Sequence, residues 1–122
     1  MGRVVHFEIP AGNTKRAVDF YGKVFGWTFA KYPGPMEYWL VATGDSAVPG
    51  IDGGILPNGD QVRSTTNTIQ VSSVDDAAAA VKNAGGKQLS SKNAIPGVGY
   101  FAYCEDTEGN RFGVMQSDVN AK

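Results

Sequence analysis

The segment Arg3–Ala30 constrains the fold more than any other part of the chain. It opens with alternating apolar and polar residues, and this period of two predicts a half-buried strand. The apolar face consists of Val5, Phe7 and Ile9, and the polar face of His6 and Glu8. Asn13 or Thr14 can then cap a helix that ends at Gly26, after which the chain extends again. The segment therefore predicts a strand, a helix and a second strand.

A weaker copy of this pattern begins at Thr66. In the second predicted strand, Thr68 and Gln70 are interpreted as the counterparts of His6 and Glu8. The following helix, capped by Ser73, has an apolar stripe that lies 60 positions after that of the first helix. The apolar positions of the first helix are Ala17, Val18, Tyr21, Val24 and Phe25. Those of the second helix are Val74, Ala77, Ala78, Val81 and Ala84, which lie 60 positions after Thr14, Ala17, Val18, Tyr21 and Val24. This register indicates an internal structural duplication.

Further extended segments follow each helix. In the first half these are Met36–Thr43 and Ile51–Leu56, the latter weakened by two glycines. In the second half they are Tyr100–Cys104 and Arg111–Gln116, joined by a turn in which Gly109 takes a positive φ. We therefore expect a single domain of 122 residues, with one module at about 3–57 and a second at about 65–116.

Composition narrows the class of partner. The formal net charge of −1 gives no electrostatic footprint for nucleic acid or for an anionic membrane. No apolar run is long enough to span a membrane, and the N-terminus lacks a signal-peptide core. The single cysteine, Cys104, rules out an internal disulfide and is expected to be a small buried apolar residue. We expect a cytoplasmic protein whose partner is a small molecule.

Paired strand-helix-three-strand modules, with the segments HFEIP at residues 6–10, AVDFYGKVFGW at 17–27 and DTEGNRFGV at 106–114, resemble the vicinal oxygen chelate superfamily. This superfamily includes glyoxalase I, bleomycin-resistance proteins, extradiol dioxygenases and methylmalonyl-CoA epimerase. The resemblance implies an α+β fold in which two βαβββ modules form a half-open, barrel-like cleft. It is specific for fold and weak for function, because the superfamily hosts many activities.

Strand parity then assigns the two faces of each sheet. The residues expected under the helices are Val5, Phe7, Ile9, Ile69, Val71, Phe112 and Val114. Those expected to face the cleft are His6, Glu8, Thr68, Gln70, Arg111, Gly113 and Met115. Among the aromatic residues of the third strands, Tyr38 and Tyr103 are expected on the cleft side, because tyrosine hydroxyls favour a wet or paired environment. Together with Gly54, these predictions give a ligand-binding set of His6, Glu8, Tyr38, Gly54, Thr68, Gln70, Tyr103, Arg111 and Gly113.

The metal-dependent members of the superfamily hold a divalent ion through four ligands, usually two His and two Glu. Carried over residue by residue, His6 matches the first ligand, but Gly54, Thr68 and Gly113 stand at the other three positions. One imidazole does not hold a catalytic metal, so no metal and no other cofactor are expected. A site rebuilt from His6, Glu8 and Asp52 is a disfavoured alternative, because side chains two residues apart on a flat strand diverge.

Three functions remain open on this basis. The first is a metal-free small-molecule binder, with the ligand in the cleft between the modules. The second is a lyase or isomerase that acts on a small oxygenated substrate through His6 or Glu8, with or without a weakly held metal. The third is an assembly module with a vestigial cleft. A homodimer is expected in each case, because the exposed edges of the half-sheets favour pairing.

Overall fold

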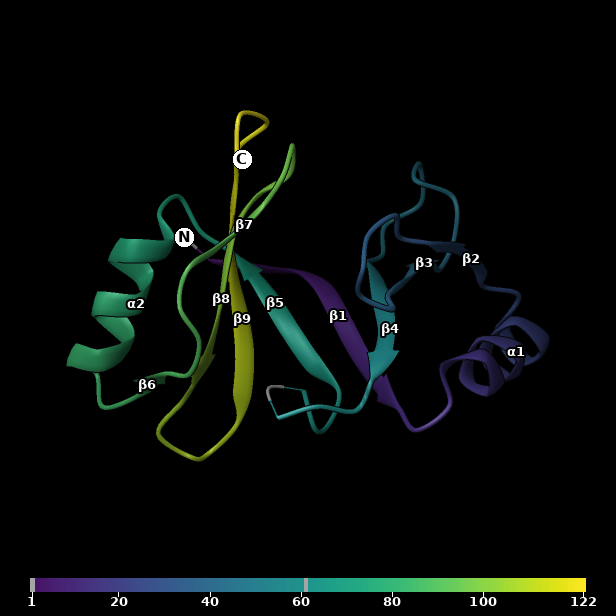
Figure 1. The fold of residues 1–122 in the computed structure, drawn as a ribbon, viewed down its shortest axis with the longest axis horizontal. Coiled ribbons are helices and arrows are strands. Elements are labelled where there is room, and N and C mark those ends of the chain that lie inside the picture. The colour runs from purple at the N-terminus through teal and green to yellow at the C-terminus, as the bar shows by residue number, and fades with distance from the viewer. Residues whose placement is uncertain (1, 61) are drawn as a thin grey trace. The chain divides into compact units, whose positions relative to one another are not determined.

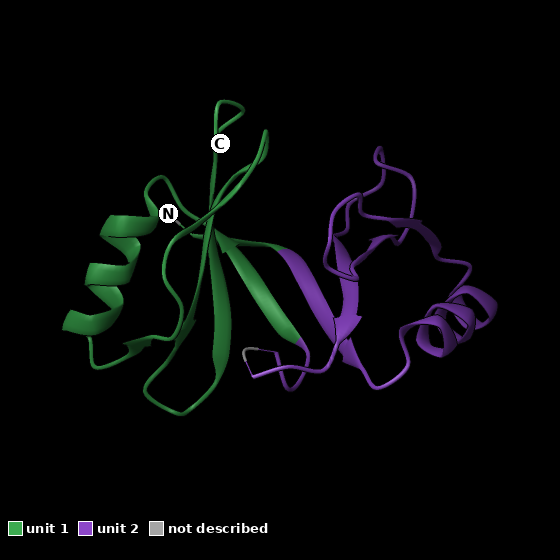
Figure 2. Ribbon diagram, in the orientation of Figure 1, with its two compact units in different colours: residues 1–5, 66–122 green, residues 6–65 purple. Residues whose placement is uncertain are grey.

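The computed structural model describes residues 2–60 and 62–122, which form two compact units (Figure 2). Unit 2 comprises residues 6–65, and unit 1 comprises residues 66–122 together with residues 1–5. Each unit contains one helix and one set of paired strands (Figure 1). The α+β fold of two βαβββ modules predicted from the sequence is thereby confirmed.

The sheet of unit 2 has the strand order β2-β3-β4-β1. β1 and β4 are parallel, whereas β3 is antiparallel to both of its neighbours. The elements in chain order are β1 (Arg3–Ala11), α1 (Thr14–Phe25), β2 (Thr28–Lys31), β3 (Trp39–Ala42) and β4 (Asp52–Pro57). β3 begins three residues later than the predicted Met36–Thr43, because the amide of Tyr32 bonds to the carbonyl of Tyr38 and closes a turn there.

The helix α1 is capped at both ends as its sequence predicts. The side chain of Asn13 accepts a hydrogen bond from the amide of Arg16, and Gly26 adopts φ 73° and bonds to the carbonyl of Gly22. α1 packs against β2 and β4. Trp27 stacks on Tyr21 of the helix and contacts Phe7 of β1, so this aromatic column joins the helix to the sheet.

Three residues predicted to be in the core of the first module are exposed instead. Val24 and Phe25 are 55% and 60% exposed, because only part of the apolar stripe of the helix reaches the sheet. Val5 is 37% exposed, since the pairing of β1 with β4 starts one residue later, at His6. The buried core of this unit comes from β3 and β4, where Val41 and Ile55 are almost completely inaccessible.

Unit 1 repeats the module, with the strand order β5-β9-β8. Its elements are β5 (Thr66–Gln70), α2 (Val74–Asn83), β6 (Lys87–Gln88), β7 (Asn93–Ile95), β8 (Gly99–Glu105) and β9 (Arg111–Ser117). β6 and β7 pair with opposite ends of β8, and the amides of Leu89 and Ser90 both bond to the carbonyl of Tyr103 between them. β6 and β7 thus form one interrupted strand beside β8, and no strand was predicted there from the sequence.

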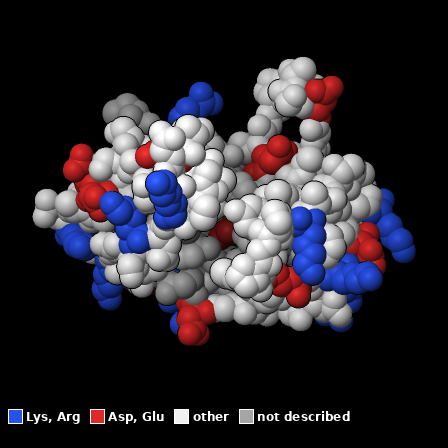
Figure 3. Space-filling model, turned by 45° about the horizontal axis from the view of Figure 1, so that its top comes forward, with Lys and Arg blue, Asp and Glu red and all other residues white. Residues whose placement is uncertain are grey.

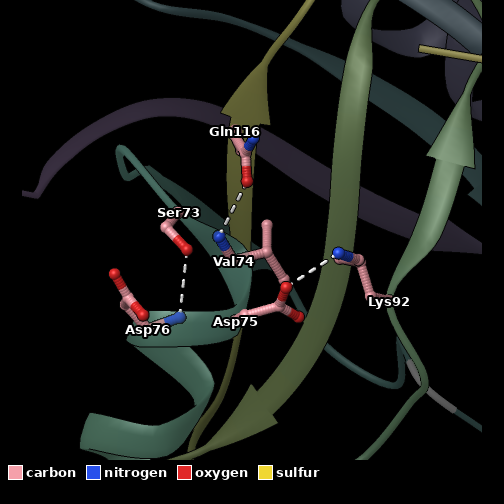
Figure 4. A network of polar contacts seen from close by, with 6 residues as sticks. All are labelled: Ser73, Val74, Asp75, Asp76, Lys92 and Gln116. Carbon is pink, nitrogen blue, oxygen red and sulfur yellow. Dashed lines mark hydrogen bonds and ion pairs between the residues drawn. The ribbon is translucent and has the colours of Figure 1, made fainter.

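The N-terminus of α2 is fixed to the sheet by side chains from three segments (Figure 4). Ser73 accepts from the amide of Asp76 at 3.1 Å, and the side chain of Gln116 in β9 accepts from the amide of Val74 at 3.0 Å. Lys92 pairs with Asp75 at 2.9 Å. Below this end of the helix lies a core of Val74, Ala102, Cys104 and Val114, in which Cys104 is buried as predicted.

Candidate functional site

One face of the sheet in unit 2 is free of the helix and collects the polar residues of β1 and β4. Register pairs His6 with Asp52 and Glu8 with Gly54, so these four positions share a face. Phe7 and Gly53 form the intervening pair and lie on the opposite face, toward α1. Of the four, Glu8 is the most buried side chain, at 6% exposure.

Tyr38 fills the space above Gly54. A Cβ atom added to Gly54 would overlap the hydroxyl end of the Tyr38 ring. The same hydroxyl lies 2.8 Å from Nε2 of His6, within hydrogen-bond distance. Glycine at position 54 is therefore required for the tyrosine to reach the histidine across the sheet.

The environment of His6 favours its neutral form. Burial lowers the pKa of His6 below its usual value, and this effect outweighs the opposing influence of the nearby Glu8 and Asp52 carboxylates. At neutral pH the imidazole is therefore uncharged. Its Nδ1 forms no hydrogen bond with the part of the chain that the structure describes, and so remains available for another group.

Asp52 is held at the start of β4 by Thr43. Its Oδ1 accepts from the amide of Thr43 at 2.9 Å and from the threonine hydroxyl at 3.3 Å. The hydroxyl also lies 2.8 Å from the carbonyl oxygen of Ile51. These contacts fix the carboxylate beside His6, its partner in the strand register.

A pocket of about 350 Å³ opens on this side of unit 2. It is mainly apolar, with His6 and Asp52 as its ionisable residues. Strands β2 and β3 supply most of its walls, since Thr28 pairs with Ala42, and Ala30 with Leu40. The described residues that line it are His6, Thr28, Phe29, Ala30, Leu40, Val41, Ala42, Asp52 and Gly53. An apolar hollow with a few polar groups at one side is the usual form of a small-molecule site.

The corresponding positions of unit 1 are less polar. Gly113 pairs with Thr68, and a Cβ atom on Gly113 would overlap the ring of Phe101. The strand partner of Gly113 is Tyr103, and Phe101 lies two residues before it. In the same way, the strand partner of Gly54 is Leu40, and Tyr38 lies two residues before it. Thr68 is buried, and its hydroxyl forms no hydrogen bond with any described residue.

The register corrects one predicted correspondence. Thr68 pairs with Gly113 as Glu8 pairs with Gly54, and each lies five residues before the helix cap, at Ser73 and Asn13 respectively. Thr68 is thus the counterpart of Glu8, and Thr66 takes the position of His6. The prediction was wrong by two residues because the weak alternation of the second strand leaves its register undefined.

Comparison with known proteins places the chain in a family. Residues 3–44 match the family described as bleomycin resistance protein-like N-terminal. A glyoxylase-like domain-containing protein of Didymella fabae is 34% identical over 118 residues, an alignment that covers 89% of each chain. The chain belongs to the vicinal oxygen chelate superfamily.

Solved structures of several proteins share the fold at low sequence identity. Methylmalonyl-CoA epimerase from Mycobacterium tuberculosis has a TM-score of 0.70 at 13% identity, covering 94% of this chain and 87% of the epimerase. The Streptomyces coelicolor epimerase, solved with 2-nitronate-propionyl-CoA, has a TM-score of 0.70 at 15% identity and covers 98% and 97%. A hypothetical protein from Bacillus halodurans has a TM-score of 0.72 at 11% identity and covers 99% and 98%.

The residues at the superfamily's metal-ligand positions do not fit a metal ion. Gly54 and Gly113 lack donor atoms, and aromatic rings occupy the space where longer side chains would lie. Among the described residues, no three His, Cys, Asp or Glu side chains are grouped so that they could hold an ion. The rebuilt site of His6, Glu8 and Asp52 stays a disfavoured prediction.

The remaining predicted site residues lie along the open face of unit 1. Tyr103 pairs with Gly113, whereas Arg111 lies at one end of β9 opposite Glu105. Gln70 pairs with Met115 and donates to the hydroxyl of Ser117 at 3.2 Å. Within unit 1 the structure thus brings Thr68, Gly113 and Tyr103 together and places Gln70 and Arg111 farther along the strands.

Sequence reasoning missed the pocket walls from β2 and β3. Thr28, Ala30, Leu40 and Ala42 are small or apolar, and none carries a chemical signature of its own. Their shared parity with Tyr38 is the signal that could have identified those on β3. Phe101 is another aromatic residue of β8, and its position beside Gly113 follows only from the strand register.

Charged side chains of both signs lie on the surface. On the face drawn in Figure 3, acidic and basic side chains are interspersed, and neither sign dominates. Within the described residues, no helix is long and apolar enough to cross a membrane.

Proposed function

We propose that the pocket of unit 2 binds a small organic molecule without the help of a metal ion. The observation that carries this proposal is the apolar hollow of about 350 Å³ with His6 and Asp52 in its lining. The imidazole is neutral, and its Nδ1 can donate or accept a hydrogen bond. The apolar walls would supply affinity, and the two polar groups would fix the orientation of the ligand.

The ligand proposed for this chain differs from the ligand of a structural neighbour. The Streptomyces coelicolor epimerase was solved with a CoA derivative, which carries several phosphates. None of the described residues that line the pocket is Lys or Arg. Binding of a CoA thioester there would leave its phosphates without the charged partners that usually hold them. We therefore expect a compact ligand that lies largely within the pocket.

The test is a ligand screen on chelator-treated protein, followed by a variant that fills the pocket. Thermal shift against metabolites and antibiotics would select compounds, and protein-observed NMR would then measure their dissociation constants. Ala30→Phe projects a ring into the pocket and should weaken binding at least tenfold. Ala79→Phe, at an exposed position of α2, is the matched control and should leave binding unchanged. Equal binding by both variants, or no binding of any compound, would contradict the proposal.

Calorimetric titration with zinc, nickel, manganese and ferrous iron tests the metal-free part separately. We expect no tight binding of one ion per chain, because the two glycines offer no donor atoms. Tight binding that is lost in His6→Ala would show that a site has been rebuilt around the histidine.

A second candidate function is catalysis by His6 as a general base, in a lyase or isomerase reaction. The lowered pKa favours it, since the imidazole is in its proton-accepting form at neutral pH. Once a ligand is known, incubation in D₂O and observation by NMR would reveal hydrogen exchange at an acidic carbon, or conversion to product. Loss of this exchange in His6→Gln with binding retained would support catalysis. If the wild-type protein shows neither exchange nor conversion, catalysis is contradicted and binding is the only proposed function that remains.

A further inference from the structure

We propose that Asp52 makes the pocket of unit 2 selective for ligands with a cationic nitrogen, such as a protonated amine. This inference rests on the proposed binding function and names the class of its ligand. Three features support it: the charges of the lining, the anchoring of the Asp52 carboxylate and the position of Lys31.

Among the described residues that line the pocket, Asp52 is the only one with a formal charge. His6, the other ionisable residue, is neutral at neutral pH. The charges that influence His6 are Glu8 and Asp52, and both are negative. The described residues of the lining therefore carry one formal negative charge and no positive charge, a distribution that favours a cationic ligand.

Lys31 is the cation closest in sequence to the walls, since it follows Ala30 in β2. Its register partner is Trp39, on the opposite face of the sheet from Leu40 and Ala30. The ammonium lies 5.9 Å from the centre of the Trp39 ring, a cation–π contact. Lys31 thus has a partner of its own and does not belong to the lining.

The carboxylate of Asp52 is prepared to receive a donor. The amide of Thr43 donates to Oδ1 at 2.9 Å. Its hydroxyl shares one hydrogen between Oδ1, at 3.3 Å, and the nearer carbonyl of Ile51, at 2.8 Å. These contacts restrict rotation of the Asp52 side chain. Oδ2 forms no hydrogen bond within the described part of the chain. An ammonium group of a ligand can bond to Oδ2 while Thr43 holds Oδ1, so the ligand gains a charge-assisted hydrogen bond without displacing a protein contact.

The experiment uses three probes of similar shape: 2-naphthylmethylamine, 2-naphthylmethanol and 2-naphthoate. At pH 7 they are cationic, neutral and anionic. Chemical-shift titration of the full chain should give the tightest binding for the amine and the weakest for the carboxylate. Asp52→Asn keeps the acceptor for Thr43 and removes the charge. It should weaken binding of the amine about fivefold, as expected for a partly exposed ion pair, and should not weaken binding of the alcohol.

Asp19→Asn is the matched control, because it removes the same charge from α1, outside the pocket lining. It should leave all three affinities unchanged. If the three probes bind the wild-type protein equally, or if Asp52→Asn and Asp19→Asn have the same effect, the proposed selectivity for cations is wrong. The proposed binding function of the pocket is not contradicted by that result. If none of the probes binds and the metabolite screen is also negative, the proposed function fails, and the selectivity fails with it.

Discussion

The two units place a glycine and an aromatic ring in the same arrangement but differ in its polarity. In unit 2, Tyr38 covers Gly54 and its hydroxyl reaches His6. In unit 1, Phe101 covers Gly113 beside the unpartnered hydroxyl of Thr68. Both rings occupy space in which a longer side chain on the glycine would have to lie, so the glycine and the ring are adapted to each other in each unit.

This difference shows how two copies of one module can share a pairing geometry and differ in polarity. The pairing geometry is preserved in both units, since Glu8 pairs with Gly54 and Thr68 with Gly113. The chemistry is not preserved, because unit 2 combines an imidazole with carboxylates, whereas the matching position of unit 1 offers threonine. The proposed binding function accordingly lies in unit 2.

The strongest test of the comparison is to add a methyl group at each glycine. Gly54→Ala and Gly113→Ala should each destabilise the protein by about 1–3 kcal/mol, because the methyl group overlaps an aromatic ring that must move. Urea unfolding would measure the loss. Gly44→Ala, where no neighbour lies within 4 Å, is the control and should be close to neutral.

A double variant identifies the ring as the cause. Phe101→Ala makes room beside Gly113, so the cost of Gly113→Ala should be smaller in that background than in the wild-type protein. Equal costs in both backgrounds would mean that the ring does not constrain the glycine.

Tyr38→Phe should have the next largest effect, because it removes the feature that distinguishes unit 2. Loss of the hydrogen bond to Nε2 of His6 should cost about 1 kcal/mol in unfolding free energy. Tyr32→Phe, which keeps its edge-on ring contact with Tyr38, is a control for loss of a tyrosine hydroxyl nearby. A cost that is no larger for Tyr38→Phe would indicate that the hydrogen bond contributes little.

The module order was predictable because its signals are local. Asn13, Ser73 and Gly26 act at helix ends within a few residues, and the alternation in β1 gives the faces of His6 and Phe7. The parts that failed depend on pairing between distant segments. The counterpart of His6 in the second module and the exposure of Val5 both follow from strand register, which is set by contacts more than 40 residues apart in sequence.

The candidate site was only partly predictable for the same reason. His6, Glu8 and Gly54 were placed on one face by parity and by resemblance. The hydrogen bond between Tyr38 and His6 requires the fold, because the residues come from segments 32 positions apart. The contact of Asp52 with Thr43 depends on the path of the loop between β3 and β4, for which the sequence gives no periodic signal.

The pH dependence of stability sharpens the comparison further, since His6 is the only histidine of the chain. Its pKa is lowered in the folded state, so the unfolded chain binds a proton more readily. Its contribution to stability is therefore complete above the unfolded value of about 6.5 and decreases as the pH falls toward the folded value. Unfolding at pH 7.5 and 5.5 should show a larger loss for the wild-type protein than for His6→Gln. An identical loss would assign the acid sensitivity to carboxylates.

The smallest effect is expected from making unit 1 resemble unit 2. The tip of the Phe101 ring and Oγ1 of Thr68 border the same space beside Gly113, and this oxygen would lie 3.3 Å from a Cβ atom there. Phe101→Tyr adds a hydroxyl at the tip of the ring and offers Thr68 the partner that it lacks. We expect the free energy of unfolding to rise by about 0.5 kcal/mol, the lower end of the usual contribution of a single hydrogen bond. The gain should disappear in a Thr68→Val background, because valine has no oxygen to pair. A gain that persists there would come from packing of the larger ring, and the polar difference between the units would then have no energetic consequence at this position.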